Sequence, residues 1–362
     1  MTNQQDYFWV HLIRSFAVMC VLMLHSAAQV LQLDVVFSSN DWWIGNIINS
    51  AMRMCVPLLF MITGFLLLGK SEPMEVFFRK RFSKIAIPLV VWSLIYIGWL
   101  LLVEVNNPSP ISPTSDQVTE SISALFPFSL VGIFFAPAYY HLWFMYALIG
   151  LYLCLPLLAI LVHNAERKIL WYMVILWSFS TFVIPAMQSA NMYVLIELNM
   201  VSGNIGYLVL GYLLGTAQIT KRLFMYMLPL FFISVAITAL GTWWVSTPDN
   251  LNQLFYGSTP NILTMTISSF IILRYMGDKC GVLQTAKLKS VILQSSACAF
   301  GIYLIHALFL YSFHKGLLGF TLDSIQGNAL IYIPLTAVVV YLSSFSIIYI
   351  VRKTPYLRAI AP

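Results

Sequence analysis

The stretch FWVHLIRSFAVMCVLMLHSAAQVL, residues 8–31, is apolar and long enough to cross a bilayer as one helix. Within it lie a guanidinium, Arg14, and an imidazole, His25. Eleven positions separate them, which is about three helical turns, so both side chains project from one face, roughly 16 Å apart along the axis. A charge at membrane depth costs several kcal/mol unless it is paired or hydrated, so the two residues form a candidate functional site.

The rest of the chain has the same apolar character. Of its 362 residues, 60% are hydrophobic and only 9% are charged, whereas soluble domains carry about 25% charged residues. We therefore predict a single all-α polytopic membrane domain over residues 1–362. The first apolar run lacks a basic leading segment and a clear cleavage site, which indicates a retained helix rather than a signal peptide. The five cysteines are scattered, without the spacing of a metal site or a disulfide framework.

Ten apolar segments are candidates for membrane-spanning helices. We predict them at roughly 8–32, 47–69, 85–105, 141–163, 169–186, 201–217, 223–244, 260–276, 297–314 and 328–350. The connections alternate in charge, and one alternate set holds 16 of the 19 Lys and Arg residues. By the positive-inside rule this set and both termini are cytoplasmic, which places Arg14 in the inner half of its helix and His25 in the outer half. The net charge of +6 therefore reflects orientation in the membrane and does not indicate nucleic-acid binding.

The longest outer connection covers residues 106–140. It begins with a Pro- and Ser-rich piece, and its apolar second half is interrupted by Pro127 and Pro137. That half is too short and too broken to span a bilayer, so we predict a re-entrant or interfacial helix there. A loop of this length in a compact protein is more often functional than not.

A dense basic cluster with Arg79, Arg81 and Lys84 lies in the predicted cytoplasmic loop 70–84, before the third span. One interpretation is that it anchors the inner face on anionic lipids. The other is that it binds a polyanionic cofactor, because arginine offers a planar fork of donors that suits phosphate. The residues alone leave both interpretations open.

Four side chains, those of His25, Arg53, His141 and His306, are expected to converge in the outer half of the membrane. Each has a structural alternative: an interhelical hydrogen bond for a histidine, or extension to the water interface for Arg53. A histidine base, intramembrane arginines and a cytoplasmic phosphate-binding cluster suit acyl transfer from a thioester to a hydroxyl. The histidine would take the hydroxyl proton, and an arginine would stabilise the oxyanion or position the substrate.

Together these residues resemble the membrane-bound acyltransferase-3 family. The spacing from Arg14 to His25 is similar to the family's signature, and RMCVPLLFMITGF, residues 53–65, is similar to its second-helix motif. KRFSKIAIP resembles its Arg-x-x-Arg element, HLWFMYALIGLYLCLP its His-Leu-Trp segment, and GIYLIHAL its Tyr-x-x-His segment. These motifs follow in the family's order over essentially the full length.

The resemblance implies a catalytic role for His25, and contacts of acyl-CoA with the basic element that holds Arg81. It also implies a stand-alone enzyme that O-acetylates surface or secreted polysaccharides at the bacterial inner membrane. Two positions depart from the family pattern. His11 stands where Asp is common, three residues before Arg14, and Lys84 replaces the second Arg of the Arg-x-x-Arg element, which keeps the charge but loses the bidentate geometry.

We therefore predict an integral-membrane O-acyltransferase that takes its acyl group from cytoplasmic acetyl-CoA and transfers it to a polysaccharide or lipid-linked glycan. Arg53, His141, Trp143 and His306 are expected to bind the acceptor, and no metal or nucleic-acid partner is expected. The alternative is a transporter or flippase for a glycan or lipid-linked sugar, which ten helices and an intramembrane cationic pair also permit. The lack of a mid-membrane carboxylate and of a detectable repeat counts against this alternative.

Overall fold

The computed structural model describes residues 7–32, 35–104, 133, 136–189, 192, 198 and 202–362. Within these ranges the chain is helical, with one isolated bridge between Thr247 and Asn250 and no strand. The helices are α1 (Phe8–Gln32), α2 (Asn40–Met52), α3 (Cys55–Leu68), α4 (Met74–Trp99), α6 (Trp143–Asn164), α7 (Arg167–Ser178), α8 (Ile184–Ser189), α9 (Ile205–Gly215), α10 (Lys221–Val245), α11 (Pro260–Lys279), α12 (Ala286–His314) and α13 (Ala329–Lys353). Eight helical stretches of the described residues are long and apolar enough to cross a membrane, so the chain is an all-α polytopic membrane protein, as its composition predicted.

Each of the ten predicted spans overlaps a helix of the described ranges, but the bounds differ. The predicted span 201–217 corresponds to α9, whose 11 residues reach only about 16 Å, against a hydrocarbon core of about 30 Å. The predicted span 260–276 corresponds to α11, which is less apolar than the eight stretches. The number of crossings and their orientation remain predictions. The predicted re-entrant or interfacial helix falls largely on residues 105–132, which lie outside the described residues.

The predicted span 47–69 is divided into α2 and α3 by a break at Arg53 and Met54. Pro57 is the physical cause, because its ring clashes with the carbonyl four residues earlier, that of Arg53, and it lacks an N–H. In the first turn of the new helix α3 neither property carries a penalty. The predicted span is therefore fully interrupted just before this proline.

The prediction that residues 70–84 form a loop was wrong in one respect, because most of this segment is helical. Helix α4 begins at Met74, directly after Pro73. The segment that follows is rich in Glu, Arg and Lys, which are good helix formers. The basic cluster therefore lies on the first turns of a helix and is spread around its axis.

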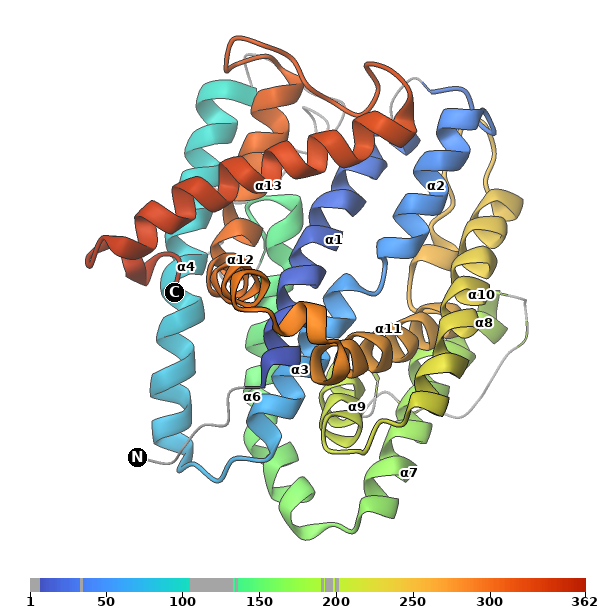
Figure 1. Ribbon diagram of the computed structural model, residues 1–362, viewed down its shortest axis with the longest axis vertical. Coiled ribbons are helices and arrows are strands. Elements are labelled where there is room, and N and C mark those ends of the chain that lie inside the picture. The colour runs from blue at the N-terminus through green and yellow to red at the C-terminus, as the bar shows by residue number, and fades with distance from the viewer. Residues whose placement is uncertain are drawn as a thin grey trace.

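Helix α1 lies at the centre of the bundle and packs against α2, α3, α11, α12 and α13 (Figure 1). Ile13 and Leu22, on opposite faces of this helix, are 0% and 1% exposed. Burial on both faces means that α1 is a fixed element around which the other helices are arranged. Its polar side chains are therefore directed into the protein and not toward lipid.

Helices α3 and α9 cross at very short range through two glycines. A Cβ atom on Gly64 would overlap the carbonyl oxygen of Leu208, and one on Gly211 would overlap that of Met61. Small residues of this kind allow membrane helices to approach backbone to backbone. The crossing holds the short helix α9 against α3.

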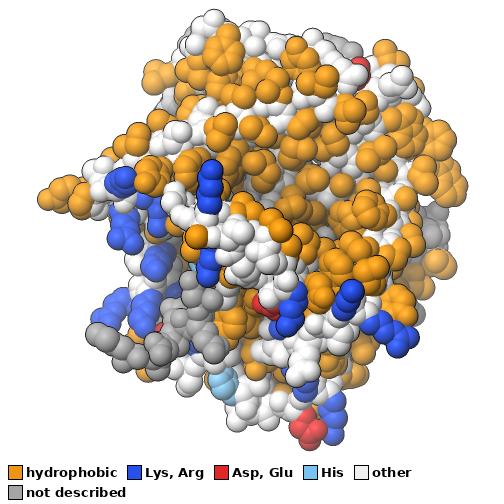
Figure 2. Space-filling model, viewed as in Figure 1, with side chains coloured by type: hydrophobic (Ala, Val, Ile, Leu, Met, Phe, Trp, Pro, Cys, Tyr) orange, Lys and Arg blue, Asp and Glu red, His pale blue; other side chains and the backbone are white. Residues whose placement is uncertain are grey.

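Figure 2 shows hydrophobic side chains over much of the upper part of one face, with Lys and Arg side chains gathered toward its lower part. Many apolar side chains are exposed, among them those of Leu157, Trp244 and Leu102, at 70%, 82% and 77%. Such exposure is expected of a surface that lies in lipid and agrees with a multi-pass membrane protein. That the basic end faces the cytoplasm stays a prediction.

The glycine crossing gives a direct test. We expect Gly64→Ala and Gly211→Ala to destabilise the protein by about 1–3 kcal/mol each, because the added methyl groups force two backbones apart. Gly98→Ala in α4 is the matched control, since nothing lies within 4 Å of its Cβ position, and it should be neutral or stabilising by up to about 1 kcal/mol. Thermal unfolding in detergent, followed by tryptophan fluorescence, measures the difference. Equal melting temperatures for Gly64→Ala and Gly98→Ala would contradict the crossing.

Candidate functional site

The break between α2 and α3 positions Arg53. Its guanidinium donates two hydrogen bonds to Asn49 Oδ1, from Nε at 2.8 Å and from Nη2 at 2.6 Å, and lies 4.0 Å from the centre of the Tyr256 ring. Asn49 Nδ2 donates to the Leu24 carbonyl oxygen at 3.1 Å, next to His25 in α1. Among the described residues, no Asp or Glu lies within ion-pair distance of Arg53. Neutral groups therefore hold the Arg53 guanidinium inside the protein. The structural alternative, in which this side chain extends to the water interface, is not what the structure shows.

Three histidines from distant parts of the chain come together. His25 lies in α1, His141 in the single turn before α6, and His306 in α12. The ring centres of His25 and His306 lie 5.3 Å apart and nearly parallel, and those of His141 and His306 lie 5.0 Å apart. We call these three residues the histidine cluster. The expected convergence of these side chains is present in the structure.

The hydrogen bonds of the cluster indicate which ring nitrogens are free. A carbonyl oxygen only accepts, so His141 Nε2 donates to Leu304 at 3.3 Å and His306 Nδ1 donates to Tyr303 at 2.6 Å. The other nitrogens, His141 Nδ1 and His306 Nε2, are buried without a hydrogen-bond partner in the described part of the chain. In neutral rings both carry lone pairs that can accept a proton or a hydrogen bond. The interhelical hydrogen bond expected as an alternative thus occupies only one nitrogen of His141, and the bond of His306 stays within α12.

A cavity of about 330 Å³, here named the histidine cavity, opens beside the cluster. Its size falls in the range of small-molecule sites. The lining side chains include the predicted His25, Arg53, His141 and Trp143, together with the aromatic rings of Phe144, Tyr207, Tyr256 and Tyr303. His306 is 0% exposed and does not line the cavity, so it lies behind His25 and His141 and not at the position expected of a direct acceptor contact.

A second cavity of about 620 Å³, the basic cavity, lies between α3, α4 and α6. Its lining cations are Arg14, Lys70, Lys80, Arg81 and Lys84. Arg81 and Lys84 therefore line one cavity together, and their binding of a cofactor stays a prediction. Arg79 is exposed and does not line the cavity, because on a helix it projects about 100° away from its neighbour Lys80.

The basic cavity contains one carboxylate, Glu72, among its described lining residues. Lys80 Nζ lies 3.2 Å and Arg81 Nη1 lies 3.0 Å from its two oxygens. Partial burial alone would raise the pKa of Glu72, but the hydrogen bond from Lys80 and the charges of Arg81, Lys80 and Lys70 outweigh it and lower that pKa. Burial and the nearby Arg81 charge lower the pKa of the Lys70 ammonium. The excess of positive charge in this cavity favours an anionic ligand.

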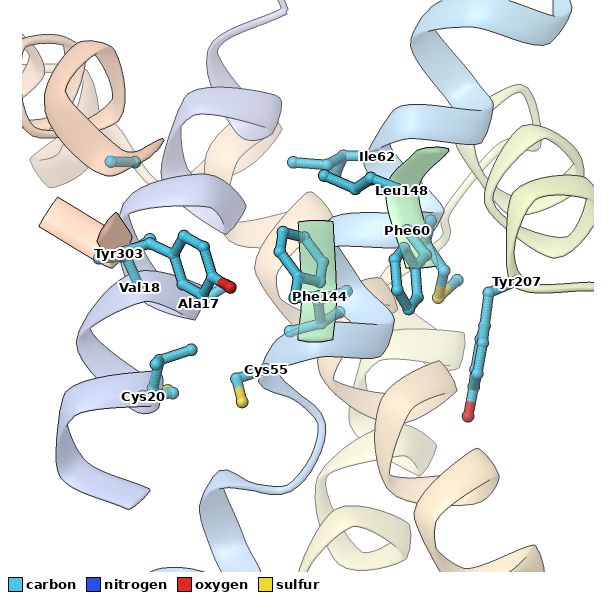
Figure 3. Close-up of a cluster of buried hydrophobic side chains, with 14 of the residues drawn as sticks. Ala17, Val18, Cys20, Cys55, Phe60, Ile62, Phe144, Leu148, Tyr207 and Tyr303 are labelled. Carbon is cyan, nitrogen blue, oxygen red and sulfur yellow. The ribbon is translucent and has the colours of Figure 1, made fainter. Parts of the chain in front are cut away.

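A third cavity of about 190 Å³, the connecting cavity, shares lining residues with the other two. It shares Arg14, Thr63 and Tyr152 with the basic cavity, and Phe144 and Tyr303 with the histidine cavity. Figure 3 shows Phe144 between Tyr303 and Phe60, with ring centres 5.2 Å and 5.3 Å away. The three cavities therefore follow one another along the α1 face that carries Arg14 and His25.

Several residues of the site were missed by sequence reasoning. Asn49 could have been found, because it lies four residues before Arg53 and such residues are neighbours on a helix. Lys70 and Lys80 belong to the basic cluster already recognised. Tyr256 comes from a short turn after α10, and no local pattern connects it to Arg53. Within the described ranges, no group of three or more His, Cys, Asp or Glu is arranged to bind a metal ion.

The hydroxyl of Tyr303 donates to the His141 carbonyl oxygen and fixes the turn that presents His141. We expect Tyr303→Phe to cost about 1–3 kcal/mol, because a buried carbonyl is left unpaired. The control is Tyr356→Phe, at a side chain that is 93% exposed. The temperature at which half of the detergent-solubilised protein aggregates gives the comparison, and no loss in Tyr303→Phe relative to the control would disprove this role of the hydroxyl.

The comparison with protein families gives a clear result. A family model described as an acyltransferase domain, of the acyltransferase-3 type, matches residues 7–349. Nothing among curated proteins and nothing among solved structures matches the chain. The matched range runs from the residue before α1 into the last turns of α13 and includes all three cavities. The chain therefore belongs to the acyltransferase-3 family of membrane acyltransferases.

Proposed function

We propose that this acyltransferase takes an acetyl group from cytoplasmic acetyl-CoA and transfers it to a hydroxyl of an extracytoplasmic polysaccharide or lipid-linked glycan, in a bacterial inner membrane. The observation that carries the proposal is the row of three cavities that joins a basic cluster to a histidine cluster. Such a row can accept a donor that carries phosphates at one end and a thioester at the other. The phosphates would lie in the basic cavity, and the thioester would reach the histidine cavity.

The basic cavity suits the phosphates of the donor. Its cations outnumber its single carboxylate, and Arg81 offers the forked donors that match phosphate oxygens. Arg79 lies close enough in sequence to add to the local potential without lining the cavity. The connecting cavity is lined mainly by apolar side chains such as Val18, Leu59 and Ile62, which suits the slender uncharged arm that carries the thioester.

The histidine cavity suits the reaction itself. His25 takes the proton of the acceptor hydroxyl as its oxygen attacks the thioester carbonyl carbon. Collapse of the tetrahedral intermediate breaks the carbon–sulfur bond, and the thiolate leaves with the proton from His25, giving an ester and free CoA. Arg53, which lines the same cavity as His25, stabilises the intermediate oxyanion. Arg14 lies about three helical turns from His25 and instead attracts the anionic donor.

The acceptor side is the part of the histidine cavity lined by Trp143 and Tyr256. Trp143 is 47% exposed although it lines the cavity, so its ring lies at the surface where a sugar face can stack on it. His141 adds a hydrogen-bonding group that faces the same space. His306 supports both histidines from behind, and its bare Nε2 can take a proton or a hydrogen bond.

The first experiment tests the base. We expect His25→Gln to lower acetyl transfer by about a hundredfold to ten-thousandfold, the usual contribution of a positioned general base. The measurement is transfer of labelled acetyl from acetyl-CoA to glycan by the purified protein. His163→Gln at the exposed end of α6 is the control. Undiminished transfer in His25→Gln would overturn the assignment, and glycan movement without acetyl-CoA consumption would favour the flippase alternative.

The second experiment tests the basic cavity. Glu72 competes with phosphate for Lys80 and Arg81, so Glu72→Gln should tighten CoA binding by about two- to fivefold, the range expected for a partly exposed ion pair. Glu75→Gln is the control, because Glu75 is exposed and lies in the first turn of α4 without an ion pair to a described residue. Calorimetric titration with CoA at low and moderate salt measures both. Weaker binding in Glu72→Gln would show that Glu72 orders the cations instead of competing with the ligand.

A further inference from the structure

Arg14 lines both the basic and the connecting cavity, yet its side chain has an unusual set of neighbours. Its Nη1 donates to Ser296 Oγ in α12 at 3.4 Å. In the described part of the chain, no Asp or Glu lies within ion-pair distance of it. A buried cation is normally paired, so the way this one is held calls for an explanation.

His11, one turn before Arg14 on the same face of α1, shares the same serine. Its Nδ1 lies 2.9 Å from Ser296 Oγ. Because a guanidinium only donates, Ser296 Oγ accepts from Arg14, and its own hydrogen is then free to be donated to His11 Nδ1. Nearby, the hydroxyl of Ser15 donates to the Ile292 carbonyl at 3.0 Å and fixes α1 against α12 at the same level.

We propose that His11 and Ser296 are positioning residues whose imidazole and hydroxyl form a bridge, which orients Arg14 between the two cavities and leaves its positive charge available to the acyl donor. The inference rests on the proposed function and adds a part to it. A carboxylate at this position would orient the guanidinium equally well but would offset much of its charge. A hydroxyl and an imidazole give the orientation without that offset, so a phosphate of the donor can use the full charge of Arg14.

The bridge makes a prediction that a purely structural hydrogen bond does not. Ser296→Asp adds a carboxylate beside Arg14, and Ser296→Asn adds a neutral group of nearly the same shape. We expect the KM for acetyl-CoA to be about tenfold higher in the Asp variant than in the Asn variant, because a charge-assisted contact to the donor is lost. The kcat values of the two variants should lie within about twofold of each other.

The serine itself is tested by a second pair. Ser296→Ala should raise the KM for acetyl-CoA, and Ser296→Thr should restore it, because threonine keeps the hydroxyl. Ser295→Ala is the control, since that hydroxyl accepts from Tyr341 at 2.6 Å and is not part of the bridge. His11→Asp compared with His11→Asn repeats the charge test at the other end of the bridge if the Ser296 variants do not fold.

The wild-type protein is assayed first, so that two failures can be distinguished. No acetyl transfer by the folded wild type would overturn the proposed function. Transfer by the wild type with equal KM values for Ser296→Asp and Ser296→Asn would leave that function standing and overturn the bridge. Equal KM values for Ser296→Ala and the wild type would likewise overturn it, whereas the charge-dependent difference together with rescue by threonine would establish it.

Discussion

Two partly buried arginines, with no Asp or Glu of the described residues within ion-pair distance, impose the constraint on which the rest of this structure depends. Arg14 and Arg53 are oriented by a serine, an asparagine and an aromatic ring, groups that fix a guanidinium but offset little of its charge. A cation in a medium of low dielectric needs an anion or water nearby. Each arginine accordingly lines a cavity, and the helices are arranged so that both cavities lie along α1.

The break in the second span and the central position of α1 serve the same arrangement. The break presents Arg53 to the histidine cavity, and the burial of α1 on opposite faces directs Arg14 and His25 inward. The glycine crossing then brings α9, which carries the cavity-lining Tyr207, close to α3. The backbone properties of one proline and two glycines thus determine where Arg53 and the walls of the histidine cavity meet.

Sequence reasoning reached the parts of this arrangement that local patterns encode. The all-α membrane class follows from composition, and the shared face of Arg14 and His25 follows from helical spacing. The gathering of His25, Arg53 and His141 on one cavity agrees with their expected depth, whereas their chemical roles remain proposals. The error over the loop 70–84 came from reading basic residues as a sign of a loop when the same residues favour helix.

Other parts depend on contacts between distant segments. Nothing local places Ser296 of α12 beside Arg14, or Tyr256 beside Arg53. Nor does any local pattern show that His306 would lie behind the cavity and not within it. Such partners are selected by how whole helices pack, so their identification requires the three-dimensional arrangement.

The predicted depth of Arg14 in the membrane has an electrical consequence. Cells that maintain a membrane potential keep their interior negative, and moving one elementary charge across the full membrane changes its energy by about 2.3 kcal/mol per 100 mV. In the proposed orientation, an anionic donor that advances from the cytoplasm toward Arg14 leaves the negative side, so the field draws it in. The rate of acylation would then depend on the membrane potential of the cell, without any ion being transported.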